Sequence, residues 1–525
     1  MMIDGGFSAP HITEEDAGNF EDVRRIRNDQ WRFFLGEDLS GIPTGGLQGG
    51  LGGGMTSGNR RYITRGTDDG LPLKTDNAQI LQTLAKGGLG AVWGAACSYF
   101  SNEELTSMNL PPDEMQESYK AVTKLIGISG PASSYGTQPP LKPDHNAEAI
   151  LKRGAGHDLR PFVNEWTEVP DSHQESKKMR VEQPYSAVLT EDLGSRRAYD
   201  YTDMEYYTDP SRSVWRPQYL IEELQKHPHF RYEPGWIAER ISEDDQGATV
   251  YVRSMGRPLP LTPSRGEGGK EEMTFTAKRI VLAAGAVGTA RILLRSFGLH
   301  VQDIPFVAKP HAFIACLHPR MFGRSGPKER GSLCQLLVTD EEKTADHFDA
   351  ACAQIYSYRS LLLFRLIASL PLPAPEALAL ASLLTPSLMI ADIRFPAGPE
   401  GNSLRLNSET DAVQISMQPS EQEKQNHAIT LKRMRKNLRS LGLLPIRTMM
   451  LPEGSSSHYA GTVPVRSEKG ATPLSTDANG KLHQGKHIFV ADASVFPILP
   501  PKPHTLTIMA NAERIAGHLL KSLPS

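Results

Sequence analysis

The chain has 525 residues, of which 39% are hydrophobic and 22% are charged. This composition is typical of a folded globular protein with roughly two to four domain-sized units, and it excludes a disordered chain or a fibrous repeat. The formal net charge is −3 and no dense block of lysine and arginine occurs, so we expect no nucleic-acid partner.

Cysteine usage and hydropathy exclude further classes. The four cysteines lie far apart without a CxxC pair, which predicts neither a metal site nor a disulfide framework. The most apolar region, residues 361–393, has an uncharged run at 377–391 that is shorter than the ~18 to 20 residues of a membrane-spanning helix. We therefore expect core helices or the wall of an apolar channel there, and no transmembrane segment. The first residues, MMIDGGF, show no signal peptide, so we expect a cytoplasmic protein.

The N-terminal part of the chain begins with a short strand pattern. MMID is typical of the end of a buried strand that finishes in the acidic Asp4, and residues 21–35 have a helical pattern. Residues 45–61 are dense in glycine, but a phosphate-binding loop needs a strand before it and a helix after it. Neither flank is present, so a flexible surface loop is the better interpretation. The full GxGxxG spacing occurs nowhere in the chain.

The next predicted elements alternate between helices and strands. Residues 78–100 combine a possible helix with a series of glycines around Trp93, which suits a backbone pressed against a flat partner. Residues 112–127 are expected to be helical. From His227 to residue 277 three short strand patterns predict an antiparallel meander. Residues 431–443 form an amphipathic helix pattern.

Two segments predict a buried strand followed by a tight turn and a helix. One is RIVLAAGAVGTARILL at 279–294, with its turn at Gly285, and the other is HIFVADASVFP at 487–497, followed by a helix from Thr505. Ligands bind at the carboxyl ends of strands in open parallel sheets, although such units are common in any α/β protein. Asp492 could accept a hydrogen bond from a ribityl or ribose hydroxyl, and the helix N-terminus near Thr505 would stabilise negative charge on a reduced ring system.

Two histidines flank the second of these strands. His458 lies in a loop of small residues upstream, and His504 lies directly before the downstream helix. A single histidine is usually structural, but these two can reach one face of whatever binds there. Histidine is the natural general base near neutral pH.

Four motifs in this order resemble the glucose-methanol-choline (GMC) oxidoreductases. They are KGGLGAVWGAA at 86–96, RIVLAAGAVGTARILL at 279–294, SSSHYAGT at 455–462, and the segment from VADASVFP to AERIAGHLL at 490–520. The resemblance implies an α/β fold: a doubly wound, Rossmann-like, three-layer FAD-binding sheet assembled from several chain segments, with a second α+β substrate domain built on an antiparallel sheet. The expected boundaries are 1–125, 227–300 and 456–525 for the FAD domain, 301–455 for the substrate domain, and 126–226 for a linking or covering segment.

The resemblance also implies an activity and a set of site residues. Such enzymes move a hydride from the CH–OH group of a small alcohol or sugar to FAD while a histidine takes the hydroxyl proton, and the electron acceptor is left open. By that resemblance His458 is the active-site base. The cofactor would contact Asp492 and Ala493, the loop with Gly87, Gly88 and Trp93, the turn at Gly285 and the helix N-terminus at Thr505.

The sequence departs from the family pattern in two places. The second catalytic position falls on Pro503, which has no side-chain donor or acceptor, so either His504 takes over through a shifted loop or His458 works alone. The strand–GxGxxG–helix that precedes the strand ending in Asp4, the expected ribose-binding acid, is also not found. About 25 to 30 residues of a dinucleotide fold would be absent, so we expect weak FAD binding. A non-redox flavin-containing lyase and a flavin-free partner or binding protein remain alternatives.

Overall fold

The structure is a computed structural model. It describes residues 1–8, 62–154, 179–201, 209, 211–255, 272–322, 333–346, 348–357, 371–470, 472 and 474–522. The predicted helix 21–35 and the glycine-rich loop 45–61 lie outside these residues. Within them the fold is mixed α/β, with several sheets and two large hydrophobic cores.

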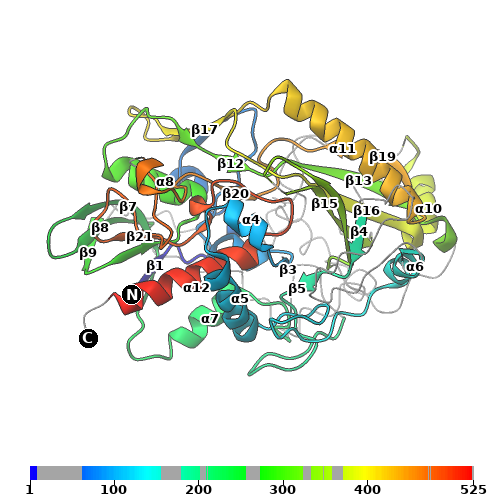
Figure 1. The fold of residues 1–525 in the computed structure, drawn as a ribbon, viewed down its shortest axis with the longest axis horizontal. Coiled ribbons are helices and arrows are strands. Elements are labelled where there is room, and N and C mark those ends of the chain that lie inside the picture. Colours follow the sequence, from blue (N-terminus) through cyan, green and yellow to red (C-terminus); the bar gives the residue numbers. More distant parts are fainter. Residues whose placement is uncertain are drawn as a thin grey trace.

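The largest sheet is antiparallel and has six strands in the order β19-β13-β16-β15-β14-β4. One face is covered by α11 (Glu421–Ser440), which begins after the Ser420 cap and packs Leu431, Met434 and Leu438 into the second core (Figure 1). The amphipathic helix predicted at 431–443 is thus part of a helix that begins ten residues earlier. The strands of this sheet are β4 (Met179–Glu182), β13 (His311–Leu317), β14 (Leu336–Lys343), β15 (Asp349–Ser357), β16 (Leu388–Arg394) and β19 (Leu444–Met450).

Parallel strands form two short pairs. β1 (Met2–Asp4) pairs with β6 (Tyr232–Pro234), and β10 (Ile280–Leu282) pairs with β21 (Ile488–Val490). The predicted strands ending in Asp4 and before Gly285 and Asp492 are therefore confirmed. Their expected burial holds for β21 alone: β1 is half-buried, and Val281 of β10 is 45% exposed. Among the described residues these pairs are separate units, so the doubly wound sheet stays a prediction.

The predicted meander is confirmed with one correction. β7 (Trp236–Glu243), β8 (Ala248–Ser254) and β9 (Glu272–Ala277) form an antiparallel three-stranded sheet. The first predicted strand divides at Gly235, whose φ of 89° breaks the extended chain. Its first half is β6, which leaves the meander to pair with β1.

A pair of helices lies beside the parallel strands. α12 (Thr505–Lys521) and α5 (Pro112–Ile126) run side by side (Figure 1), and the Tyr119 hydroxyl is 2.7 Å from the Thr507 hydroxyl. α5 confirms the helix predicted at 112–127: Pro112 suits a first helical position, and Gly127 with φ of 71° ends the helix. The possible helix within 78–100 is wrong, because this range forms the 3-10 turn η4 (Gly88–Val92) and the short strand β3 (Ala96–Cys97), and no α-helix.

The remaining elements connect these units. They are the helices α3 (Thr67–Gly70), α4 (Asn102–Ser107), α6 (His145–Gly154), α7 (Pro217–Leu224), α8 (Gly285–Ser296) and α10 (Ala374–Leu384), the 3-10 turns η5 (Pro319–Met321), η6 (Thr385–Ser387), η7 (Glu468–Gly470) and η8 (Ala493–Val495), and the strands β2 (Leu73–Asp76), β3 (Ala96–Cys97), β5 (Tyr185–Ser186), β11 (Ile304–Pro305), β12 (Val307–Ala308), β17 (Asn402–Leu406), β18 (Val413–Met417) and β20 (Tyr459–Ala460).

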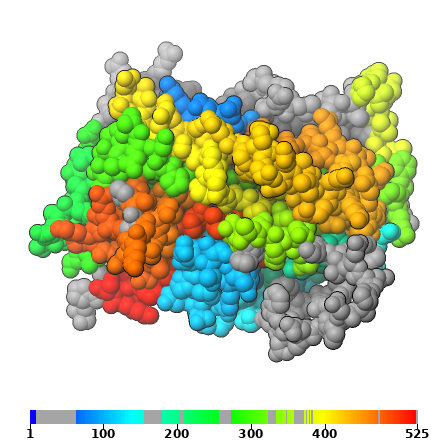
Figure 2. All heavy atoms as spheres, turned by 45° about the horizontal axis from the view of Figure 1, so that its top comes forward, coloured from blue at the N-terminus to red at the C-terminus, as the bar shows by residue number. Residues whose placement is uncertain are grey.

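Two predicted absences concern membranes and thiols. No helix in the described part of the chain is long and apolar enough to cross a bilayer. The four cysteines are buried and unpaired with one another, as the sequence predicts. Segments far apart in sequence interleave at the surface: residues near 100, 345 and 500 lie side by side on the face shown in Figure 2.

Candidate active site

The loop that carries His458 is fixed by backbone hydrogen bonds. His458 directly precedes β20, which pairs with β12, and its carbonyl accepts a hydrogen bond from the Lys309 N–H at 3.1 Å. The Tyr459 hydroxyl donates to the Gly454 carbonyl at 2.8 Å and accepts from the Leu81 N–H at 2.9 Å. Both ends of the loop are thereby held, and the half-buried His458 side chain stays in one place.

His504 comes to the same place from a different segment. It is the N-cap residue of α12 and is only 4% exposed. Its imidazole lies edge-on to that of His458, with ring centroids 4.6 Å apart and ring planes at 85°. The loop before α12 therefore brings His504, and not the side chain of Pro503, against His458.

Both imidazoles are held in the neutral form. Burial lowers the pKa of His458 well below its usual value, and the positive charge of Arg394 lowers it further. Burial, Lys309 and Arg394 likewise lower the pKa of His504. The Nδ1 atom of each ring is buried without a hydrogen-bond partner among the described residues. A neutral imidazole has one nitrogen that can accept a proton, so the pair has the chemistry of a general base.

A polar network supports the His458 loop from the six-stranded sheet. The Arg394 guanidinium donates to the Asp392 carboxylate at 2.6 Å, and the other carboxylate oxygen lies 3.4 Å from Nδ1 of His311. Nε2 of His311 is 2.9 Å from the Ser455 hydroxyl, and Arg394 donates to the Ser456 carbonyl at 3.4 Å. His311, Asp392 and Arg394 alternate along β13 and β16 with residues of the core beneath α11. Their side chains therefore lie on the face of the sheet that α11 does not cover.

Sequence reasoning missed this sheet face. Lys309, His311, Asp392 and Arg394 were not expected to take part in the site. One signal was available: Asp392 and Arg394 are charged residues two apart in the otherwise apolar run LMIADIR, a spacing that puts both on one face of a strand. Nothing in the sequence, however, shows that this face turns towards His458.

Asp492 joins two turns within the protein. Its carboxylate accepts four hydrogen bonds, from the Gly285 N–H (2.9 Å), the Thr289 hydroxyl (2.6 Å), and the N–H and hydroxyl of Ser494. These donors use the four lone-pair sites of a carboxylate, so none is left for a ribityl hydroxyl. Asp492 instead joins the start of α8 to η8, where Ala493 is buried.

Asp4 lies at the other parallel pair. Its Oδ2 accepts from the Gly87 N–H at 3.3 Å and from the Tyr232 hydroxyl at 3.1 Å, and burial raises the pKa of its carboxyl. The expected loop residue Trp93 is next to Trp215: its indole N–H donates to the Trp215 carbonyl at 2.8 Å, and the two rings meet edge to face. The structure thus brings Asp4 and Gly87 together.

Several features fit a bound FAD. A side chain at Gly88 or Gly285 would meet no protein atom within 4 Å, and both residues have the positive φ that glycine tolerates. α12 begins at Thr505 without a side-chain cap, so its first N–H groups can face negative charge. Together with the unpartnered Nδ1 atoms of the histidines, these features fit a flavin near α12. No group of three metal-ligating side chains occurs among the described residues.

Comparisons with known proteins agree with this geometry. Residues 400–512 match the family model described as GMC oxidoreductase. No curated protein sequence matches the chain. Among solved structures the chain resembles pyridoxine 4-oxidase from Mesorbium loti, with a TM-score of 0.55 and 13% identity over 99% of this chain and 94% of that one. At this identity the structural likeness shows the fold alone, and the family match covers residues 400–512, so this part of the chain is similar to the GMC oxidoreductases.

Proposed function

We propose that this chain is an FAD-dependent oxidoreductase that oxidises the CH–OH group of an alcohol or sugar, with His458 as the general base. The observation that carries the proposal is the pair of neutral, edge-on imidazoles at 4.6 Å, each with a buried Nδ1 that has no hydrogen-bond partner in the described part of the chain. The match of residues 400–512 to the GMC oxidoreductase model supports an alcohol-oxidising flavoenzyme in general.

The two histidines have different exposures and therefore different roles in this proposal. His458 is half-buried and is the more exposed of the two, so in this proposal it takes the proton of the substrate hydroxyl. His504 is 4% exposed and lies against the His458 ring, so it restricts the orientation of that ring. It also lies next to the positive charge that forms when His458 takes the proton. FAD, when bound, supplies the acceptor for the hydride. Burial, together with the positive charge of Arg394, keeps His458 unprotonated before the reaction.

The substrate belongs to a broad class in this proposal. The fold relative is named for oxidation of pyridoxine, a small aromatic alcohol, which favours a small-molecule alcohol here. The electron acceptor is either oxygen or another molecule, and oxygen consumption under steady turnover distinguishes the two.

The test is anaerobic reduction of the FAD-loaded protein by a panel of primary alcohols, sugars and pyridoxine. We expect at least one alcohol to bleach the flavin absorbance. His458→Ala should then slow flavin reduction by roughly 10² to 10⁴, the usual effect of removing a general base. His229→Ala, which removes an exposed histidine, is the matched control and should leave the rate unchanged.

Other results would favour the alternatives. If an alcohol reduced the flavin of His458→Ala as fast as that of the unmodified chain, the role proposed for His458 would be wrong. A flavin that no alcohol bleaches would favour the non-redox lyase, and a chain that takes up no FAD would favour the flavin-free partner protein.

A further inference from the structure

One buried lysine contacts both histidine-bearing segments. Lys309 lies between β12 and β13 and has no exposed surface. Its backbone N–H donates to the His458 carbonyl at 3.1 Å, and its Nζ donates to the Lys502 carbonyl at 2.7 Å. Because Lys502 is two residues before His504, Lys309 links the two segments directly.

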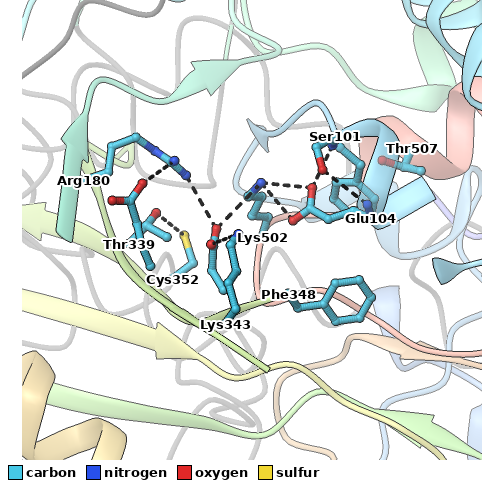
Figure 3. Close-up of polar contacts among 12 residues, drawn as sticks. Ser101, Glu104, Arg180, Thr339, Lys343, Phe348, Cys352, Lys502 and Thr507 are labelled. Atoms are coloured by element: carbon cyan, nitrogen blue, oxygen red, sulfur yellow. Dashed lines mark hydrogen bonds and ion pairs between the residues drawn. The ribbon is translucent and has the colours of Figure 1, made fainter. Parts of the chain in front are cut away.

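The segment 502–504 is also held from the other side. The Lys502 ammonium lies 2.9 and 3.0 Å from the two oxygens of the Glu104 carboxylate (Figure 3) and 3.9 Å from Asp349. Glu104 is itself fixed, because it closes a capping box with Ser101 at the start of α4. Asp349 is 1% exposed and also accepts from Lys343 at 2.7 Å.

The two lysines hold the segment by different interactions. Burial alone would lower the pKa of Lys502, but the carboxylates of Glu104 and Asp349 raise it above its usual value, so its side chain is an ammonium ion. Burial and the charge of Arg394 lower the pKa of Lys309 well below its usual value. Its described polar partner is a carbonyl, so Lys309 acts as a buried N–H donor. Side chain and backbone of residue 502 are therefore fixed separately.

We propose that Lys309 is a positioning residue of the active site, which sets the place of the His504 ring against the His458 ring through its two hydrogen bonds. The proposal rests on the proposed function in taking these two histidines as the reacting pair. Lys309 cannot touch the substrate, because it has no exposed surface. Its effect passes through the backbones of His458 and Lys502, with the Glu104–Lys502 ion pair as the second anchor.

Two substitutions separate the hydrogen bond from the charge. Lys309→Met has a similar length but no donor, and Lys309→Gln keeps an N–H donor without any charge. In the FAD-loaded protein we expect Lys309→Met to lower kcat about tenfold to a hundredfold with little change in KM, because small displacements of a catalytic group have effects of that size. Lys309→Gln should recover part of this loss. Lys120→Met, at an exposed lysine of α5, is the matched control.

A second readout does not depend on turnover. The chain is labelled with ¹³C at the histidine ring, and the His458 and His504 signals are assigned by their loss in His458→Gln and His504→Gln. We expect Lys309→Met to shift both signals and to change their titration midpoints, whereas Lys120→Met shifts neither. Lys502→Met removes only the second anchor and should shift the His504 signal alone.

The outcomes separate this proposal from the proposed function. If no alcohol reduces the flavin of the unmodified protein, the function fails, while the histidine signals still test the role of Lys309. If Lys309→Met leaves both signals and kcat unchanged, or only lowers the melting temperature, the positioning role is refuted. Should Lys309→Met fail to fold, Lys309→Leu, which also lacks a donor, takes its place: unshifted His458 and His504 signals in that variant would overturn the proposal.

Discussion

The carboxylate of Asp492 accepts a hydrogen bond from the backbone N–H of Gly285 at 2.9 Å, although the two residues are 207 positions apart in sequence. Each residue follows the carboxyl end of one of two paired parallel strands: Asp492 comes after β21, and Gly285 comes after β10. The bond therefore fixes the start of α8 relative to the start of η8. Gly285 has φ of 77° and open space where a side chain would be, which leaves its contact with a cofactor a prediction.

Replacing Asp492 by Asn should destabilise this junction. An amide keeps one acceptor oxygen but points an NH₂ group at donors such as the Gly285 N–H or the Ser494 hydroxyl, which leaves buried donors unpaired. We expect the free energy of unfolding to fall by about 1 to 3 kcal/mol, measured by urea denaturation. Thr289→Val removes only one of the four hydrogen bonds and should cost less. Equal stability of Asp492→Asn and the unmodified chain would contradict this account of the carboxylate.

The position next to Pro503 can be tested by comparing two substitutions. His504→Asn removes the ring that contacts His458, whereas Pro503→Ala removes a side chain that can form no hydrogen bond. We expect His504→Asn to slow flavin reduction by about tenfold or more, within the range of acid–base contributions, and Pro503→Ala to have a much smaller effect. The reverse order would show that His504 is not the second residue of the site.

The pH dependence of flavin reduction follows from the lowered pKa of His458. A protonated imidazole cannot take the hydroxyl proton, so the rate falls as the pH falls through the pKa of His458. Because burial and Arg394 lower that pKa, the loss should begin below the usual histidine value of 6.5, and the rate should be constant at neutral pH. The measurement is the rate of flavin reduction at saturating substrate between pH 5 and pH 8.

Arg394→Gln provides the control for the cause of this shift. Removing a positive charge near His458 makes protonation easier and raises its pKa, so the acid limb should move to higher pH. The Asp392 carboxylate then loses its partner and acts in the same direction. An acid limb that stays in place in Arg394→Gln would show that burial alone sets the pKa.

Local patterns predicted the parts of the site that lie within one stretch of sequence. The strand before Gly285, the strand before Asp492 and the helix from Thr505 each follow from an apolar run, a small-residue turn and a helical period. The pattern could not show the use of the Asp492 lone pairs, because two of its donors, Gly285 and Thr289, are about 200 residues away.

Local patterns could not predict the sheet face that lies next to the histidines, for the same reason. Lys309, His311 and Arg394 become neighbours of His458 only through the pairing of β12 with β20 and of β13 with β16. Such pairing depends on long-range packing, which alternation within one strand does not encode. The sequence also could not decide whether His504 replaces Pro503 as the second residue of the site. The path of the loop that brings His504 to His458 depends on contacts with Lys309 and Glu104, which lie in other segments.

The last prediction concerns a histidine outside the candidate site. His427 on α11 lies against Phe395, with ring centroids 4.3 Å apart, and burial lowers the pKa of His427 to about 4. In the unfolded chain the ring has its usual pKa of 6.5, so below that pH the unfolded state binds a proton that the folded state does not. The contribution of this histidine to stability is therefore present above pH 6.5 and is lost as the pH falls towards 4.

His427→Gln isolates this effect, because glutamine does not titrate. Between pH 7 and pH 4.5 the free energy of unfolding of the unmodified chain should fall by up to about 2 to 3 kcal/mol relative to the variant, since each pKa unit corresponds to ~1.36 kcal/mol. Urea denaturation at several pH values measures the difference. His229→Gln, at an exposed site, should run parallel to the unmodified chain. A constant difference between the unmodified chain and His427→Gln over this range would mean that the His427 ring is protonated in the folded state, and that its contact with Phe395 does not exclude the charged form.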